Sequence, residues 1–184
     1  MRHGPHGISG RSIVAARTVP VISSQAPNNP ISSGLWNTQL GALASWSTRP
    51  VIFSYWQNTT AQSLTNNTGA PIQWDTLNAD SDQAYSNTTR FTCPVTGWYS
   101  IAGTAVFAAN ATGVRTAQIA VNGALVPFGL GQVPAASGVR TAVSAEVIYH
   151  LSAGDYVELY ATQSSGAALA TAQGSCLNAN WIST

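Results

Sequence analysis

Apolar and polar residues alternate through residues 90–109, and this pattern predicts the strand around which the other elements are arranged. The second half of the segment places four apolar side chains on one parity: Tyr99, Ile101, Ala105 and Phe107. A period of two is typical of a β-strand with one buried face. Residues 94–97 supply a turn, and Phe91 lies in a shorter strand before that turn. We therefore expect residues 90–109 to form a hairpin that enters the core.

The same alternation recurs along the rest of the chain. Three further strands have apolar residues at every second position: Ala117, Ile119 and Val121; Val143, Ala145, Val147, Tyr149 and Leu151; Val157, Leu159 and Ala161. Asn122 and Gly123 form a strong two-residue hairpin signal, whereas residues 124–138 contain Gly and Pro and are expected to be irregular. Three more strands are predicted: residues 49–56, 72–75 and 178–184. Eight or more short strands at regular spacing indicate an all-β fold, a jelly-roll β-sandwich.

The N-terminal segment follows a different pattern. Residues 12–23 are rich in β-branched side chains but contain Pro20, which favours an extended arm or an edge strand. Glycines recur with period three at the start of the chain: Gly4, Gly7 and Gly10. Such a run is either a short collagen-like start or part of a flexible or partner-bound arm, and the sequence leaves both interpretations open.

A short amphipathic helix is predicted after this arm. Trp36, Leu40 and Leu43 recur at helical spacing, although Gly41 weakens the helix. A stripe of this kind usually packs onto its own domain, so we favour that interpretation over a helix that docks on another protein.

Composition changes the picture of the surface. Of 184 residues, 45% are hydrophobic, which suffices for the core of one domain with an appendage. Only 7% are charged, far below the ~25% of ordinary soluble domains, and this favours a surface that partners cover. The net charge is +1, and all seven basic residues are Arg, a usage that a GC-rich coding sequence favours.

The sequence argues against membrane and nucleic-acid partners. No apolar run approaches the ~20 residues of a membrane span, and no signal-peptide core is present, so we expect an unprocessed chain. Three arginines before Arg49 are too sparse for nucleic-acid binding. Cys93 and Cys176 lie in no metal-binding pattern, and either two free thiols or a disulfide remains open.

No catalytic or metal-binding motif emerges. Asp75, Asp80 and Asp82 suggest calcium, but their spacing lacks the glycine and the terminal glutamate of an EF-hand loop. Glu146 and His150 would lie on one face of a strand but ~13 Å apart at ~3.3 Å per residue. Nucleophile-elbow, phosphate-loop and zinc-protease motifs do not occur. We therefore expect no enzyme activity, no cofactor and no resident metal.

The order of several motifs resembles the globular C1q-like domain of the tumour-necrosis-factor superfamily. These motifs are FTCPVTGWYSI at residues 91–101, HLSAGDYVELYA at residues 150–161 and the closing Trp181. The resemblance implies a ten-stranded jelly roll that forms homotrimers, often behind a collagen-like stalk. It implies a C1q-like head over residues 49–184 and an N-terminal attachment arm over residues 1–48.

The alternation of residues also points to a trimer interface. Tyr156 and Tyr160 leave their strand on the face opposite Val157, and we expect them to lie beside Trp98 and Val106. Several aromatic residues and few charges are typical of an interface. The open alternative is that loops or the arm cover this face.

C1q-like domains resembling this one occur in virion proteins of actinobacteriophages. The resemblance and the charge-poor, Lys-free composition favour a capsid decoration or head spike, located in the virion and assembled in the host cytoplasm. Four residues would mark the arm that binds the major capsid protein or another virion protein: Arg2, Arg11, Arg17 and Trp36. The alternative is a receptor- or glycan-binding tail-fibre or surface module of C1q type. Its contacts to a host glycan or protein would come from surface loops: residues 76–89, 110–113, 124–138 and 164–175.

Overall fold

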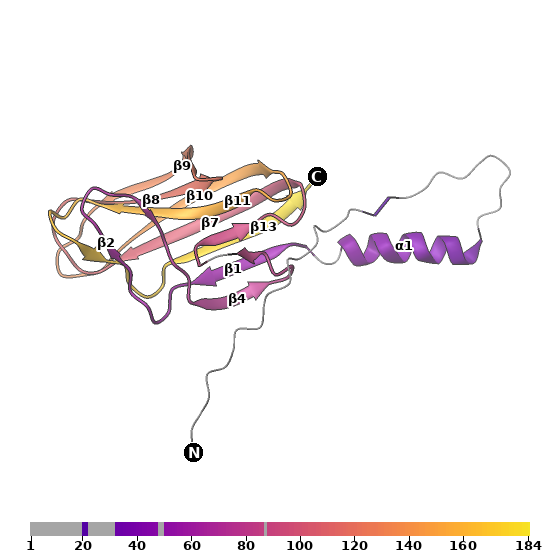
Figure 1. Cartoon of the computed structure of the whole chain (residues 1–184), viewed down its shortest axis with the longest axis horizontal. Coiled ribbons are helices and arrows are strands. Elements are labelled where there is room, and N and C mark those ends of the chain that lie inside the picture. The colour runs from indigo at the N-terminus through magenta and orange to yellow at the C-terminus, as the bar shows by residue number, and fades with distance from the viewer. Residues whose placement is uncertain (1–19, 22–31, 48–49, 87) are drawn as a thin grey trace, which may run out of the picture.

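Antiparallel strands pair into two main sheets that pack face to face (Figure 1). The computed structural model describes residues 20–21, 32–47, 50–86 and 88–184. Within these residues the five-stranded sheet has the order β10 (Thr141–Leu151), β7 (Gly97–Phe107), β13 (Cys176–Ser183), β1 (Ile52–Trp56) and β4 (Thr76–Asp80). The predicted all-β jelly-roll sandwich is therefore confirmed.

The six-stranded sheet covers the other side of the core. Its described strands run in the order β5 (Tyr85–Ser86), β6 (Arg90–Thr92), β11 (Tyr156–Gln163), β8 (Val114–Val121) and β9 (Ala124–Pro134), and β3 (Ala70–Pro71) also pairs with β11. A small separate pair joins β12 (Leu169–Ala170) to β2 (Ser63–Leu64). β8, β10 and β11 thus form much as the alternation predicts, and β1 and β13 form within or close to the other predicted strands.

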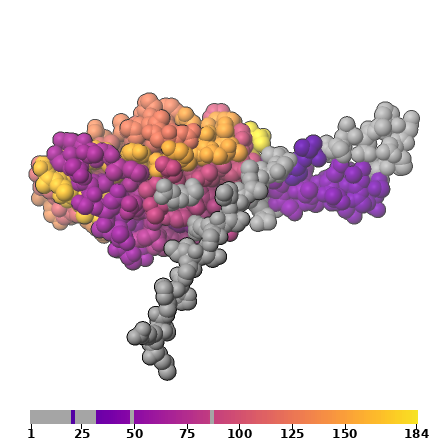
Figure 2. Space-filling view, in the orientation of Figure 1, coloured from indigo at the N-terminus to yellow at the C-terminus, as the bar shows by residue number. Residues whose placement is uncertain are grey.

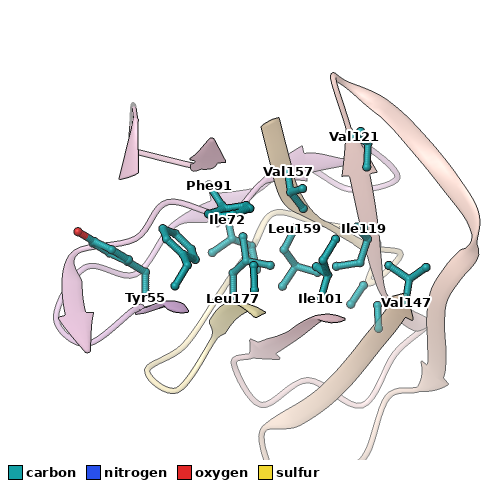
Figure 3. Packing of buried hydrophobic residues seen from close by; sticks show 14 of the residues in the cluster. Tyr55, Ile72, Phe91, Ile101, Ile119, Val121, Val147, Val157, Leu159 and Leu177 are labelled. Carbon is teal, nitrogen blue, oxygen red and sulfur yellow. The ribbon is translucent and has the colours of Figure 1, made fainter. Parts of the chain in front are cut away.

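The core lies between the inward faces of the two sheets (Figure 3). Ile101 of β7 and Ile119 of β8 are buried there, as the alternation predicts. Leu159 of β11 points across the core at Gly103 of β7, where an added Cβ atom would lie only 2.7 Å from the leucine Cδ1 atom. Glycine at position 103 therefore provides the space that Leu159 fills.

The expected hairpin over residues 90–109 is wrong. β6 pairs with β5 and β11 in the six-stranded sheet, whereas β7 pairs with β10 and β13 in the five-stranded sheet. The turn between them crosses the sandwich, and the Tyr99 hydroxyl donates to the Val95 carbonyl oxygen (2.7 Å) inside it. A turn signal marks a change of direction, but it does not determine whether the two strands pair.

Two other local predictions also need correction. Residues 72–75 form no strand, and Trp74 is instead buried with its indole N–H donating to the Thr89 carbonyl oxygen (3.1 Å). Most of residues 124–138, expected to be irregular, belong to β9. Prolines are tolerated in β9 because it is an edge strand, and the Asn122-Gly123 turn (φ 51° and 78°) joins it to β8 as predicted.

The two cysteines are free thiols in this structure. Cys93 is buried after β6 and lies against the Val95 carbonyl oxygen, whereas Cys176 lies half-buried on the outward face of β13. The two residues thus occupy different layers of the fold, so the disulfide alternative is wrong for this state.

The predicted helix forms as α1 (Ser33–Ser47). Ser32 begins it, because its hydroxyl accepts a hydrogen bond from the Leu35 backbone N–H (3.2 Å). The expectation that α1 packs onto its own domain is wrong: no α1 residue is buried, and the helix stands outside the head (Figure 2). Among the described residues, no helix is long and apolar enough to cross a bilayer.

The edge strands β9 and β10 come into close contact and join one side of the two sheets. An added Cβ atom on Gly131 of β9 would overlap the backbone oxygen of Ser144 in β10. We expect Gly131→Ala to lower the free energy of unfolding by about 2 kcal/mol, because the two edges would have to separate.

Gln132→Ala is the matched control, since Gln132 is the exposed neighbour in the same strand. We expect it to change stability by less than about 0.5 kcal/mol. Urea unfolding followed by tryptophan fluorescence measures both variants. Equal stability of the two would contradict the close contact between β9 and β10.

Candidate interaction surface

Exposed apolar side chains gather where β9 meets β10. Phe128 is 68% exposed and Ile148 is 62% exposed, and Leu130 is also exposed. The Phe128 ring stacks on the half-buried Tyr149 ring, with 6.2 Å between centroids and 19° between planes. We call this the β9–β10 edge. Side chains of this size lose their contact with water only if another surface covers them.

A second group of exposed apolar residues lies at the end of the five-stranded sheet where β7 begins. Ile148 and Ile52 flank Ser100 and Asn180 in one row of the outward face, and Ile182 is exposed at the end of β13. Trp98 is 44% exposed and meets the His150 ring edge-on at 5.3 Å. We call the following set the apolar rim: Ile52, Trp98, Ile148 and Ile182.

Val106 does not join the rim. It lies on the outward face of β7 like Trp98, but ~26 Å away along the strand at ~3.3 Å per residue. Small residues separate the two positions, and Val106 is half-buried beside residues 172–175. The structure thus places two of the expected interface residues on one face but at opposite ends.

The expectation that Tyr156 and Tyr160 lie beside Trp98 and Val106 is wrong. Both tyrosines belong to β11, and their side chains leave the outer face of the six-stranded sheet. The alternation correctly predicts that they point away from the core. It cannot predict which sheet carries a strand, because pairing depends on partners distant in sequence.

The two tyrosines instead cover an ion pair. The Arg90 guanidinium donates through Nε to the Glu158 carboxylate (3.0 Å), and Thr89 donates to the same oxygen (2.7 Å). The Arg90 guanidinium carbon lies 3.9 Å from the Tyr156 ring centroid, and Glu158 is only 2% exposed. The hydrogen bond that Arg90 donates to Glu158 raises the pKa of Arg90, and burial raises the pKa of Tyr160. Tyr156 and Tyr160 thus have a role within one chain.

Helix α1 touches the head through tryptophan. The Trp46 ring meets the Trp181 ring edge-on, with 4.7 Å between centroids and 84° between planes. Trp181 pairs with Tyr99 in the β13–β7 register and packs against the core. The contact joins the C-terminal turn of α1 to the sheet end that carries the apolar rim.

The Asp75 carboxylate organises the loop after β1. It accepts hydrogen bonds from the backbone N–H groups of Asn58 (2.7 Å), Thr59 (2.8 Å) and Thr60 (2.7 Å) and from the Thr76 hydroxyl (2.9 Å). Desolvation by the surrounding loop opposes ionisation, but these hydrogen bonds outweigh it and hold the pKa of Asp75 well below its usual range. The carboxylate therefore acts as a loop anchor.

Other loops are held in the same way. The Asp80 carboxylate accepts the backbone N–H groups of Ala84 and Tyr85. The fully buried Arg115 donates to carbonyl oxygens of residues 110, 112 and 114, and burial lowers its pKa. The Gln163 side chain bonds to Leu64, Ser165 and Ala167. Within the described residues, no three His, Cys, Asp or Glu side chains form a group that could hold a metal ion.

Of the predicted attachment residues, the structure describes one, Trp36. Arg2, Arg11 and Arg17 lie outside the described residues. Trp36 lies in α1 and is 54% exposed, away from the head. Its role in attachment stays a prediction.

Five exposed apolar residues of the apolar rim and the β9–β10 edge were not among the predicted site residues: Ile52, Phe128, Leu130, Ile148 and Ile182. Ile148 carried a signal, because it occupies a polar position in the alternation of β10. The sequence signal for Phe128 and Leu130 was weaker, because the Gly and Pro residues around them predict an irregular segment and not the strand β9.

Comparison with known proteins identifies the fold. No protein-family model matches the chain, and no curated protein sequence matches it significantly. The globular domain of zebrafish complement 1qA protein is 18% identical and superposes with a TM-score of 0.55, covering 72% of this chain and 97% of that one. Murine APRIL at pH 8.5 is 10% identical (TM-score 0.55; 72% and 99% covered), and Eiger TNF from S. frugiperda is 10% identical (TM-score 0.57; 73% and 94% covered). The head therefore has the C1q/TNF-like fold that the sequence motifs indicate.

The low pKa of Asp75 predicts an acid-dependent loss of stability. Ionised Asp75 stabilises the fold above its ordinary pKa of 3.8, and this contribution is lost as the pH falls toward the folded-state pKa. We expect Asp75→Asn to lower the free energy of unfolding at pH 7 by about 1 kcal/mol, since the carboxylate is exposed and its bonds are partly screened. Urea unfolding between pH 7 and pH 2.5 should show the difference from wild type shrinking below about pH 4. A constant difference across this range would contradict the assignment.

Proposed function

We propose that this chain is a non-enzymatic, homotrimeric structural protein of a bacteriophage virion, a capsid decoration or head spike that its N-terminal arm anchors. The observation that carries the proposal is the exposed apolar surface formed by the apolar rim and the β9–β10 edge on a C1q/TNF-like head. Ile148 of the rim is the chain neighbour of Tyr149, on which the Phe128 ring stacks, so the two groups meet at β10.

The chemistry of this surface favours association with copies of the same chain. Glu146 is the one carboxylate on the described outward rows of β7, β10 and β13, and small uncharged residues such as Ser100 and Asn178 fill the space around it. Large apolar side chains with few charges are typical of the central part of an interface. In a monomer, the apolar side chains of Phe128, Trp98 and Ile148 would stay in contact with water, which is unfavourable in free energy. Burial of these side chains between subunits would remove that unfavourable contact.

The polar groups support a structural role over a catalytic one. Asp75, Asp80, Arg115 and Gln163 each use their hydrogen bonds to hold a loop of the head. Loops fixed in this way, and poor in aromatic residues, offer few strong binding contacts to a host glycan or protein. This favours decoration of a particle over receptor binding.

The N-terminal part of the chain supports attachment at a distance from the head. α1 projects from one end of the sandwich (Figure 1), and because Trp46 contacts the head, the N-terminal end of the helix at Ser33 lies away from the head. The absence of Lys, the 7% charged content and the resemblance to actinobacteriophage virion proteins favour a virion location. The arm would bind the major capsid protein or another virion protein.

We expect Ile148→Asp and Trp98→Asp to convert the trimer to monomers, because each places a charge within the buried apolar surface. Light scattering of the purified chain measures the mass directly, and wild type should have three times the 19.1 kDa of one chain. Thr65→Asp, which adds the same charge to an exposed loop position, should leave the trimer intact. A trimer in all three variants would remove the rim from the interface.

Attachment can be tested on the particle. We expect deletion of residues 1–47 to leave a folded trimer that no longer co-sediments with virions, whereas the full chain does. Mass spectrometry of gradient-purified virions measures the bound chain, and light scattering confirms that the deleted form is folded and trimeric. Undiminished binding of the deleted form would place attachment in the head, and absence of the full chain from virions would refute the virion assignment.

A further inference from the structure

The apolar stripe of α1 has no partner in the described chain. Trp36, Leu40 and Leu43 are 54%, 41% and 37% exposed. They are spaced by four and then three residues, which is the a/d spacing of a coiled-coil seam. The opposite side of the helix carries small or polar residues such as Thr38 and Ser45. One narrow stripe is therefore available for packing against another helix.

The helix itself needs such a partner. It has 15 residues, of which none is buried, and two of them are glycines, Gly34 and Gly41. An isolated helix of this length is marginal in water, and the interior Gly41 costs about 1 kcal/mol relative to alanine. The Ser32 cap and the Trp46 contact stabilise its two ends, whereas nothing described in the chain covers the stripe between them.

The base of α1 lies where copies of the chain would meet. Trp46 packs on Trp181, and Trp181 belongs to the sheet end that carries Trp98 and Ile182 of the apolar rim. If the heads associate through this rim, three copies of α1 leave the trimer from the same end and in the same direction. The heads would hold the helices at high effective concentration.

The charge of α1 also points to a second copy. The helix contains no acidic and no basic residue: its sequence is SGLWNTQLGALASWS. Identical helices without charge pack in parallel without like-charge repulsion, and no flanking ion pairs specify a different partner. An uncharged stripe is thus complementary to itself.

We propose that α1 forms a parallel three-helix coiled coil with the α1 helices of two other copies of this chain, as a stalk between the head and the N-terminal segment. Trp36, Leu40 and Leu43 form its core. This inference rests on the proposed homotrimer. It assigns Trp36 to contacts between copies, and attachment then depends on residues before the helix.

Disulfide cross-linking of the full chain tests the stalk. The variants are Leu40→Cys, within the stripe, and Thr38→Cys, two residues away on the opposite side of the helix. Both variants also carry Cys176→Ser, because the half-buried Cys176 thiol would otherwise compete in cross-linking. Cys93 is buried and is left unchanged. Under mild oxidation we expect Leu40→Cys to form covalent dimers with up to about two thirds of the chains, since one thiol of each trimer is left over. Thr38→Cys should cross-link at least about tenfold less, because its side chains point away from the seam.

Light scattering of the same samples before oxidation separates this inference from the proposed function. A trimeric mass with equal cross-linking of the two variants would overturn the coiled coil, leave the trimer intact and assign the stripe to another occupant, such as a virion partner. A monomeric mass would overturn both.

As a second readout, Leu40→Asp with Leu43→Asp should reduce helical circular dichroism while the mass stays trimeric. An unchanged helical signal would show that the stripe does not stabilise the helix and would also overturn the coiled coil.

Discussion

The contact of Leu159 with the backbone of Gly103 determines how the two sheets face each other. Gly103 lies in β7 of one sheet and Leu159 in β11 of the other, and a side chain at position 103 would occupy the space of the leucine methyl groups. This contact brings the inward rows of both sheets to close-packed distance. With that distance set, the edge strands β9 and β10 meet, and Gly131 packs against the backbone of Ser144. The core and the β9–β10 edge thus each require a glycine where a neighbouring strand approaches closely.

Few charges are available to this chain, and its head uses most of the described ones internally. Glu158 is buried beneath Arg90 and two tyrosines, Asp75 anchors a loop, and Arg115 is buried among carbonyl oxygens. Each of these groups gains hydrogen bonds that compensate for its removal from water. Apart from Glu146 and His150, the described outward rows of β7, β10 and β13 carry small uncharged residues and large apolar ones. That division of roles makes this sheet, and not the tyrosine-bearing one, the candidate surface between subunits.

The apolar rim and the stripe of α1 lie at the same end of the molecule, with the Trp46–Trp181 contact between them. A trimer of heads and a bundle of helices would therefore form one continuous assembly in which each part increases the local concentration of the other. The N-terminal segment would then leave the assembly in three copies. Three weak attachments to a particle act together far more strongly than one, which suits the proposed decoration role.

The sequence by itself determined the long alternating strands β7, β8, β10 and β11 and their inward faces. Alternation is a local property, so Ile101, Ile119 and Leu159 could be assigned to the core from their neighbours alone. The helix stripe was visible for the same reason. Only the tertiary structure decided that β6 and β7 belong to different sheets and that Tyr156 lies in the other sheet from the rim residue Trp98, against Arg90. Strand pairing and the covering of a surface join residues distant along the chain, and no local pattern of side chains encodes those distances.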